Sequence, residues 1–175
     1  MLSKPQLSAG DPTTRVTAVF TAIANTRMAG LPIVNPALRV EAVTFTPWEN
    51  GWLGVLVTPW CMNLLWIPIR EEPPLGQLGA KISLGFPAIA CEFVVCQEAE
   101  LGAYLSCSLF SPMAAFIHQE EARITAITVL QTLLAPVSPS EKADRSCAGE
   151  PTTTQRRWSR RALFAKWFSD TTYNA

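Results

Sequence analysis

The chain has 175 residues, of which 49% are hydrophobic and 14 are prolines, and this size is sufficient for one globular domain whose core needs no disulfide or metal. The formal net charge is zero, but residues 40–134 carry nine acidic and three basic side chains, whereas residues 155–168 carry five basic side chains and no acidic one. An acidic body with a short basic tail argues against a nucleic-acid-binding protein.

The cysteines indicate a reducing compartment. There are five of them, an odd number with no CxxC pair, which argues against a secreted disulfide scaffold: Cys61, Cys91, Cys96, Cys107 and Cys147. The N-terminal sequence MLSKPQLSAGDPTT lacks the apolar core of a signal peptide. We therefore expect a cytoplasmic protein.

The first predicted element is a helix that begins at Asp11-Pro12, where aspartate is a favourable N-cap and proline a favourable first helical residue. Its apolar residues recur at helical spacing: Val16, Val19, Phe20 and Ile23. Gly30 is suited to ending it, and a connector follows over residues 31–38. Alternation then predicts a strand over 39–45 with Val43 and Phe45 on one face, and WENG at 48–51 predicts a turn.

Residues 51–69, GWLGVLVTPWCMNLLWIPI, are nearly all apolar and are the only candidate for a membrane span. A transmembrane helix would place Pro59 and Asn63 near its centre, and an interior proline costs a helix about 3 kcal/mol. The β-branched and aromatic residues around Thr58-Pro59 instead predict two strands, 52–57 and 61–67, too apolar to leave a face exposed. The sequence thus predicts no transmembrane span.

The remaining elements complete an α+β domain. A polar loop over 70–80 precedes a short strand at 81–86, and the segments 88–97 and 101–110 are typical of an antiparallel hairpin. Ser111-Pro112 is predicted to begin a second helix with an apolar stripe facing the body: Met113, Ile117, Ile124, Ile127, Leu130 and Leu134. We therefore predict an antiparallel sheet packed with N-terminal and C-terminal helices over 1–135, a disordered linker over 136–154 and a basic amphipathic tail over 155–175.

The residues needed for catalysis or metal binding are poorly represented. The chain has a single histidine, His118, without a nucleophile elbow or a papain-type cysteine near it, and it has no glycine-rich phosphate loop. On a regular strand Cys91 and Cys96 point to opposite faces, and Cys91 lies across the hairpin from Cys107 in one register only. We expect a non-enzymatic protein with no catalytic residues, metal or cofactor, and with buried structural thiols.

The junction of the two apolar strands is the candidate binding site. Tryptophan and methionine are typical of adaptable peptide-binding surfaces, although in an apolar run they also fit an ordinary core. The candidate contact residues are Thr58, Pro59, Trp60, Cys61, Met62 and Asn63. In the tail, the basic residues fit either a solvated segment or one that binds an anionic surface: Arg156, Arg157, Arg160 and Arg161.

The stretch GWLGVLVTPWCMNLLWIP at 51–68 closely resembles the signature of the HybE family of [NiFe]-hydrogenase assembly chaperones, which includes the HupJ and HoxT proteins. The glycine-rich segment near 79–86, Phe-Val-Val at 93–95 and Ser-Pro-Met-Ala-Ala-Phe at 111–116 are also similar to the family. The resemblance spans about residues 13–134.

This resemblance implies a cytoplasmic accessory protein that binds immature [NiFe]-hydrogenase small or large subunits, alongside other hydrogenase maturation proteins. One role that it implies is to hold back the twin-arginine signal of the small subunit until assembly is complete. An acidic body with a Trp/Met-rich site suits two arginines followed by an apolar segment. The competing hypothesis is a redox or metal-handling maturation factor that uses Cys61, Cys91, Cys96 or Cys107; a permanent subunit of a maturation complex is a third.

The tail itself resembles the same export motif. SRRALFAK at 159–166 is similar to Ser-Arg-Arg-x-Phe-Leu-Lys, with Leu-Phe in place of Phe-Leu and the lysine one position late. We hypothesise that this segment occupies the chaperone's own binding site when no precursor is present. A flexible linker of about 20 residues spans about 25 Å, which is enough for the tail to fold back over a small domain.

Overall fold

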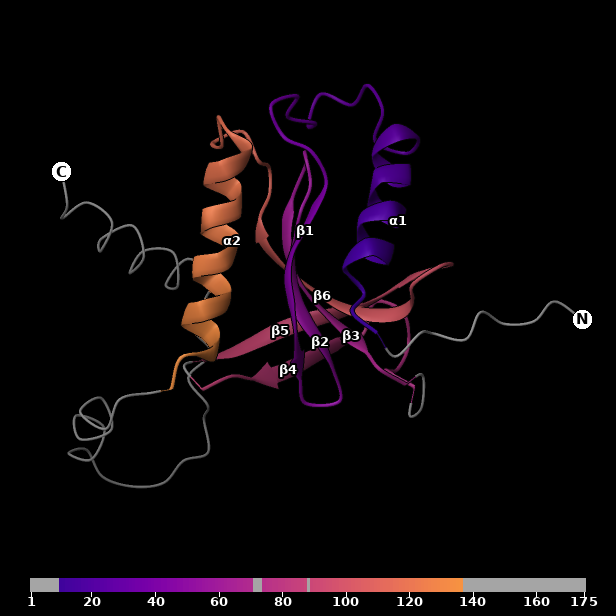
Figure 1. Cartoon of the computed structure of the whole chain (residues 1–175). Coiled ribbons are helices and arrows are strands. Elements are labelled where there is room, and N and C mark those ends of the chain that lie inside the picture. Colours follow the sequence, from indigo (N-terminus) through magenta and orange to yellow (C-terminus); the bar gives the residue numbers. More distant parts are fainter. Residues whose placement is uncertain (1–9, 71–73, 88, 137–175) are drawn as a thin grey trace, which may run out of the picture.

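The computed structural model describes residues 10–70, 74–87 and 89–136, which form six strands between two helices (Figure 1). In chain order the elements are α1 (Thr13–Asn25), β1 (Glu41–Trp48), β2 (Gly51–Val57), β3 (Met62–Pro68), β4 (Lys81–Gly85), β5 (Ala90–Glu98), β6 (Gly102–Phe110) and α2 (Gln119–Leu134). The predicted linker, from residue 137 onward, and the whole predicted tail at 155–175 lie outside these described ranges. Within them, no helix has both the length and the apolar composition needed to cross a membrane.

The strands form one antiparallel sheet in the order β1-β2-β3-β6-β5-β4, with α1 on one face and α2 on the other. The face toward α2 is packed around residues such as Leu53, Leu64 and Phe93, and the face toward α1 around Leu56 and Leu65. Both faces of β2 and β3 are therefore buried, which explains why their sequences are apolar throughout. The predicted α+β fold, with an antiparallel sheet between two helices, is confirmed.

The first helix forms where the sequence predicts it, but its N-cap is Pro12, the predicted first helical residue, and not Asp11. The Asp11 carboxylate accepts a 2.8 Å hydrogen bond from the backbone N–H of Thr13, and Pro12 occupies the N-cap position. Val16 and Phe20 are buried against the sheet, as their spacing predicts. The regular helix begins two residues after Asp11 and ends before the turn that contains Gly30.

The edge strand β1 contains a bulge that overturns one prediction about its faces. Val43 lies opposite Val55 and Thr46 opposite Leu53, so two β1 residues stand against Gly54 alone. Thr44 adopts a positive φ of 45° there. The bulge turns Phe45 onto the α1 face while Val43 packs on the α2 face, so the prediction that both share a face is wrong.

The prediction for the second helix is wrong for its start and partly wrong for its apolar face, of which Leu130 is buried and Ile127 and Leu134 pack against the core. Residues 111–118 are irregular, and α2 begins only at Gln119, where the Glu121 carboxylate accepts the N–H groups of Ile117 and His118. The residues that α2 buries are mainly small, which lets the helix lie close to the sheet: Ala122, Thr125, Ala126, Leu130 and Leu133. Ile117 and Ile124, which the periodicity places in the buried stripe, are exposed.

Candidate partner-binding surface

The turn between β2 and β3 is held together by one threonine. The Thr58 N–H and hydroxyl both donate to the Cys61 carbonyl oxygen, at 2.9 and 2.8 Å, while the hydroxyl oxygen accepts the N–H of Cys61 at 2.9 Å. The same hydroxyl accepts the Trp60 N–H at 3.3 Å. Because Thr58 is fully buried, these bonds fix the turn without help from solvent and hold Trp60 at its tip.

The six candidate contact residues differ in exposure. Trp60, Cys61 and Asn63 are half-buried, and Trp60 packs against the cluster between α1 and the sheet. Thr58, Pro59 and Met62 are buried, with Met62 0% exposed within the cluster between α2 and the sheet. In this conformation a partner meets only the first three, so direct contact with the other three does not fit the structure. Whether the accessible three bind a partner stays a prediction.

A residue that the sequence reasoning missed, Asn35, ties this turn to two other segments. Its backbone N–H donates to the Pro59 carbonyl at 2.8 Å, and its Nδ2 donates to the carbonyls of Met113 and Phe116 at 3.1 and 2.8 Å. The irregular segment before α2 thus gives two of its carbonyls to Asn35. The only sequence signal was the Asn35-Pro36 pair, which is typical of a turn but says nothing about distant partners.

An accessible ion pair joins the segment after α1 to the end of β5. Arg27, which follows α1, pairs with Glu98 at the end of β5 at 2.8 Å, and their side chains are 59% and 24% exposed. Burial raises the pKa of Tyr104 well above its ordinary value, with smaller contributions in the same direction from Cys96, Glu98 and Cys61. Glu98 pairs with Gly102 at the start of β6, whereas the candidate turn precedes Met62, which pairs with Phe110 at the end of that strand.

Asn63 has a polar atom without a hydrogen-bond partner on the face of the sheet toward α1. In β3 it lies opposite Leu56 of β2 and Ser108 of β6. Its Oδ1 is buried and accepts no hydrogen bond from any residue in the described part of the chain. A buried carbonyl oxygen without a donor is unfavourable by about 1–3 kcal/mol, so Asn63 lowers the stability of the chain in this conformation.

The described cysteines do not gather at one site, and burial raises the pKa of Cys61, Cys91 and Cys96. Burial raises the pKa of Cys61 despite an opposing hydrogen bond from Thr58, and burial together with the nearby Cys107 raises that of Cys91 to about 12. Cys91 and Cys107 pack on the α2 face and Cys96 on the α1 face, as the strand alternation predicts. Among residues 10–70, 74–87 and 89–136, no three His, Cys, Asp or Glu side chains cluster as metal ligands would.

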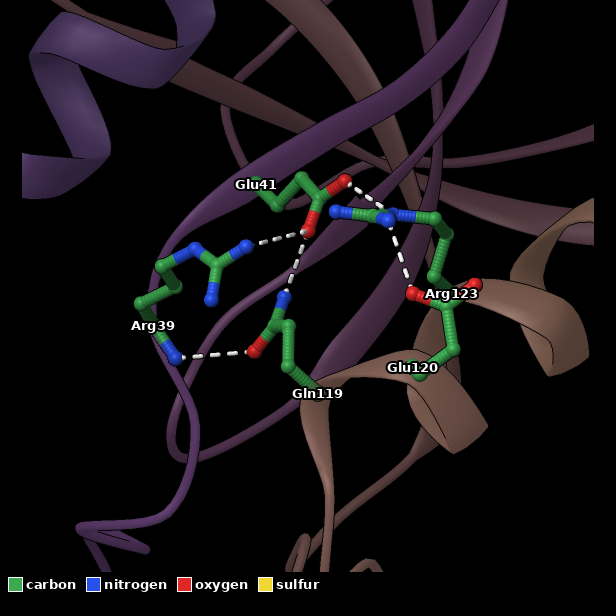
Figure 2. A network of polar contacts seen from close by, with 5 residues as sticks. All are labelled: Arg39, Glu41, Gln119, Glu120 and Arg123. Carbon is green, nitrogen blue, oxygen red and sulfur yellow. Dashed lines mark hydrogen bonds and ion pairs between the residues drawn. The ribbon is translucent and has the colours of Figure 1, made fainter.

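A polar network fastens the start of α2 to the start of β1 (Figure 2). The Glu41 carboxylate accepts from Arg123 Nε at 2.6 Å and from Gln119 Nε2 at 2.7 Å, while Arg123 also pairs with Glu120 at 2.7 Å. Burial alone would raise the pKa of Glu41, but the hydrogen bonds from Arg123 and Gln119 and the charges of Arg123 and Arg39 together hold it below its ordinary value. This carboxylate is thus engaged within the chain and is a poor candidate for binding a partner's arginine.

Replacing Glu41 with glutamine should lower the free energy of unfolding at pH 7 and make that free energy less dependent on pH. Because the pKa of Glu41 is lower in the folded chain, its contribution is fully present above the ordinary pKa of about 4.5 and is lost as the pH falls through the lowered value. Urea unfolding of the wild type and Glu41→Gln at pH 7 and at about pH 3 tests this. The difference in free energy of unfolding should shrink in acid; a difference that persists or grows would contradict the assignment. Glu100→Gln, in the exposed turn after β5, is the matched control.

The tail arginines Arg156, Arg157, Arg160 and Arg161 lie outside the described residues, so their modulatory role stays a prediction.

Comparison with known proteins identifies the class to which this fold and surface belong. Residues 11–166 match the family model described as "[NiFe]-hydrogenase assembly, chaperone, HybE". The chain therefore belongs to the HybE family of [NiFe]-hydrogenase assembly chaperones, as the resemblance at 51–68 indicates. The match extends beyond residue 135 into the predicted linker and tail, and the division at that residue stays a prediction.

Individual relatives agree with this assignment. The hydrogenase expression/formation protein HupT of Azotobacter chroococcum mcd 1 is 42% identical over 139 residues, covering 79% of this chain and 87% of its own. HoxT of Azotobacter vinelandii is 41% identical over 145 residues, covering 82% and 88%. The solution structure of HybE from Escherichia coli superimposes with a TM-score of 0.62 at 28% identity, covering 93% of this chain and 99% of that one.

Proposed function

We propose that this protein is a non-enzymatic cytoplasmic chaperone that binds precursors of [NiFe]-hydrogenase subunits, including the twin-arginine signal of the small subunit, at the surface formed by Trp60, Cys61 and Asn63. Membership of the assembly-chaperone family supports the kind of client. The observation that carries the site is the half-exposed Trp60, held at the tip of a turn whose hydrogen bonds are satisfied by the buried Thr58. A tryptophan fixed in this way offers a large contact area at little entropic cost.

The accessible ion pair between Arg27 and Glu98 supports recognition of arginine. Glu98 is bound by Arg27, whose side chain is 59% exposed. An exposed ion pair of this kind contributes little to stability, about 0–1 kcal/mol, and an incoming guanidinium therefore replaces Arg27 at small cost. A second arginine and the apolar segment of the ligand would then lie toward Trp60 and the half-buried Asn63.

Titration of the full chain with a synthetic small-subunit signal peptide, followed by calorimetry, tests this proposal. Trp60→Ala should weaken binding about 30-fold, because removal of a central tryptophan contact costs about 2 kcal/mol or more. A peptide with both arginines replaced by lysine should also bind more weakly, because lysine cannot form the bidentate contact with a carboxylate. Leu78→Ala serves as the control, since Leu78 is 70% exposed and precedes β4 at the far edge of the sheet.

Equal affinity of Trp60→Ala and the wild type would rule out the proposed surface. Equal capture of precursors with and without their signal would instead place the contact on the folded subunit. Trp60→Ala must remain folded for either conclusion, which its circular dichroism spectrum and urea midpoint establish.

Asn63→Leu separates binding from stability. Leucine has a similar size and removes the unpartnered Oδ1, so the free energy of unfolding should rise by about 1 kcal/mol while affinity for the signal peptide falls. Urea unfolding and calorimetry on the same preparation measure the two effects. A loss of stability would show that Asn63 is structurally satisfied, and an unchanged affinity would remove it from the binding surface.

A further inference from the structure

The outward face of α2 exposes apolar side chains that the rest of the described chain does not cover. Ile117 is 67% exposed just before the helix, and Ile124 is 56% exposed in its second turn. Ile124 lies on the exposed side of α2 with Glu120 and Glu121, at helical spacing from both, and Ile117 belongs to the irregular segment directly before the helix. Figure 1 shows α2 as the outermost described layer on its side of the sheet.

Acidic side chains lie beside the exposed apolar side chains of this face. Glu120 is 62% exposed, and Glu121 is also exposed. The single basic side chain of α2, Arg123, is already shared between Glu41 and Glu120. The fitting occupant is consequently a segment that is both basic and apolar.

We propose that residues 155–168 of the same chain dock on this outward face of α2. The segment, QRRWSRRALFAKWF, combines five basic residues with no acidic one, and its large apolar side chains include Trp158, Leu163 and Phe164. Its arginines add to the ion pair of Glu120 with Arg123 and to the Glu121 carboxylate that caps α2, and its apolar side chains cover Ile117 and Ile124. This contact does not rest on the proposed client-binding function, because Trp60 packs on the α1 side of the sheet.

The length of the connecting chain fits this placement. Seventeen residues separate Ile117 from Leu134, which corresponds to about 25 Å along a helix. The roughly 18 residues between 136 and 155 have a root-mean-square span of about 21–25 Å as a flexible chain. The tail therefore reaches back along α2 to its N-terminal end, and tethering gives it an effective concentration of about 1 mM.

This placement differs from the hypothesis that the tail occupies the client site. The two positions are distinguishable because Ile117 and Ile124 line one of them, whereas Trp60 and Ile33 belong to the other. Ile33 is exposed in the connector that Asn35 bonds to the turn.

Methyl NMR of the full chain, labelled at isoleucine δ1 and tryptophan indole positions, tests the inference. The variant Arg156→Glu/Arg157→Glu/Arg160→Glu/Arg161→Glu should shift the methyl signals of Ile117 and Ile124, and about 0.5 M salt should do the same to the wild type by screening the charges. The control Lys142→Glu/Arg145→Glu reverses two charges between α2 and the tail and should leave these signals in place. A synthetic peptide of residues 155–168, added to the tail variant, should restore them with half-saturation at about 1 mM or below.

Several outcomes would overturn the inference. Ile117 and Ile124 signals that stay unchanged in the tail variant would show that the tail does not dock there. Shifts at Ile33 and Trp60 instead would place it on the client surface. Shifts that depend on protein concentration would assign the α2 face to a second copy of the chain. Ile82, in β4 at the far edge of the sheet, should remain unaffected throughout.

Discussion

Replacing Met62 with alanine is expected to lower the free energy of unfolding by about 2–5 kcal/mol, because the thioether is 0% exposed and its removal leaves a cavity. Met62 packs between α2 and the sheet with Leu64 and Met113. Urea unfolding monitored by tryptophan fluorescence measures the loss. Leu78→Ala, at a 70% exposed position, should change the free energy of unfolding by less than about 0.5 kcal/mol.

This result would separate two residues that the sequence grouped together. Trp60 and Met62 are both predicted contact residues, yet only the first is accessible in the structure. Met62→Ala should therefore affect signal-peptide binding only through the population of folded protein, whereas Trp60→Ala should affect binding directly. A Met62→Ala protein that remains as stable as the wild type but loses affinity would show that Met62 becomes exposed to the client.

Gly54→Ala should lower the free energy of unfolding by about 1–3 kcal/mol through overpacking. The Phe45 ring lies directly over Gly54, and a Cβ atom added there would approach its Cγ to 2.6 Å. Phe45 belongs to the core beneath α1, so the ring cannot withdraw without opening that cluster. The measurement is again urea unfolding.

Gly85→Ala provides the matched control for this substitution. Gly85 is also a strand residue, but a Cβ atom there meets nothing within 4 Å. Its replacement should leave stability unchanged or slightly improved, since alanine restricts the unfolded chain. Equal effects of the two substitutions would contradict the packing of Phe45 on Gly54.

The parts of the fold that depend on local pattern could be predicted from the sequence. The apolar runs on either side of Thr58-Pro59 form β2 and β3, and the Glu98-Ala99-Glu100 turn joins β5 to β6. In each case the alternation or the turn residues determine the structure within a few positions. The buried face of α1 was predictable for the same reason.

The features that depend on distant contacts could not be predicted. The phase of α2 is set by how closely Ala122 and Ala126 approach the sheet, so counting large apolar residues selected Ile124 wrongly. The start of that helix depends on Asn35, which lies about 80 residues earlier and binds the carbonyls of Met113 and Phe116. The β1 bulge likewise reflects the fit of Phe45 over Gly54 in the neighbouring strand.

The candidate site was predictable as a location and only partly as a set of residues. The Pro59 junction stood out because large side chains follow a break in strand pairing, and the structure holds Trp60 half-exposed there. Strand alternation after the turn sends Met62 into the α2-side core and Asn63 to the other face. Glu98 and Arg27 are brought together only by the fold, since 71 positions separate them.

The irregular backbone of β1 has a consequence for how copies of the protein behave when crowded together. An edge strand with free N–H and C=O groups is a template on which another chain can extend the sheet, and this leads to aggregation. The positive φ at Thr44 and the missing N–H of Pro47 interrupt that template, while the opposite edge, β4, is short and carries the exposed Lys81. The edges of the sheet thereby resist pairing with the edges of another copy of the chain.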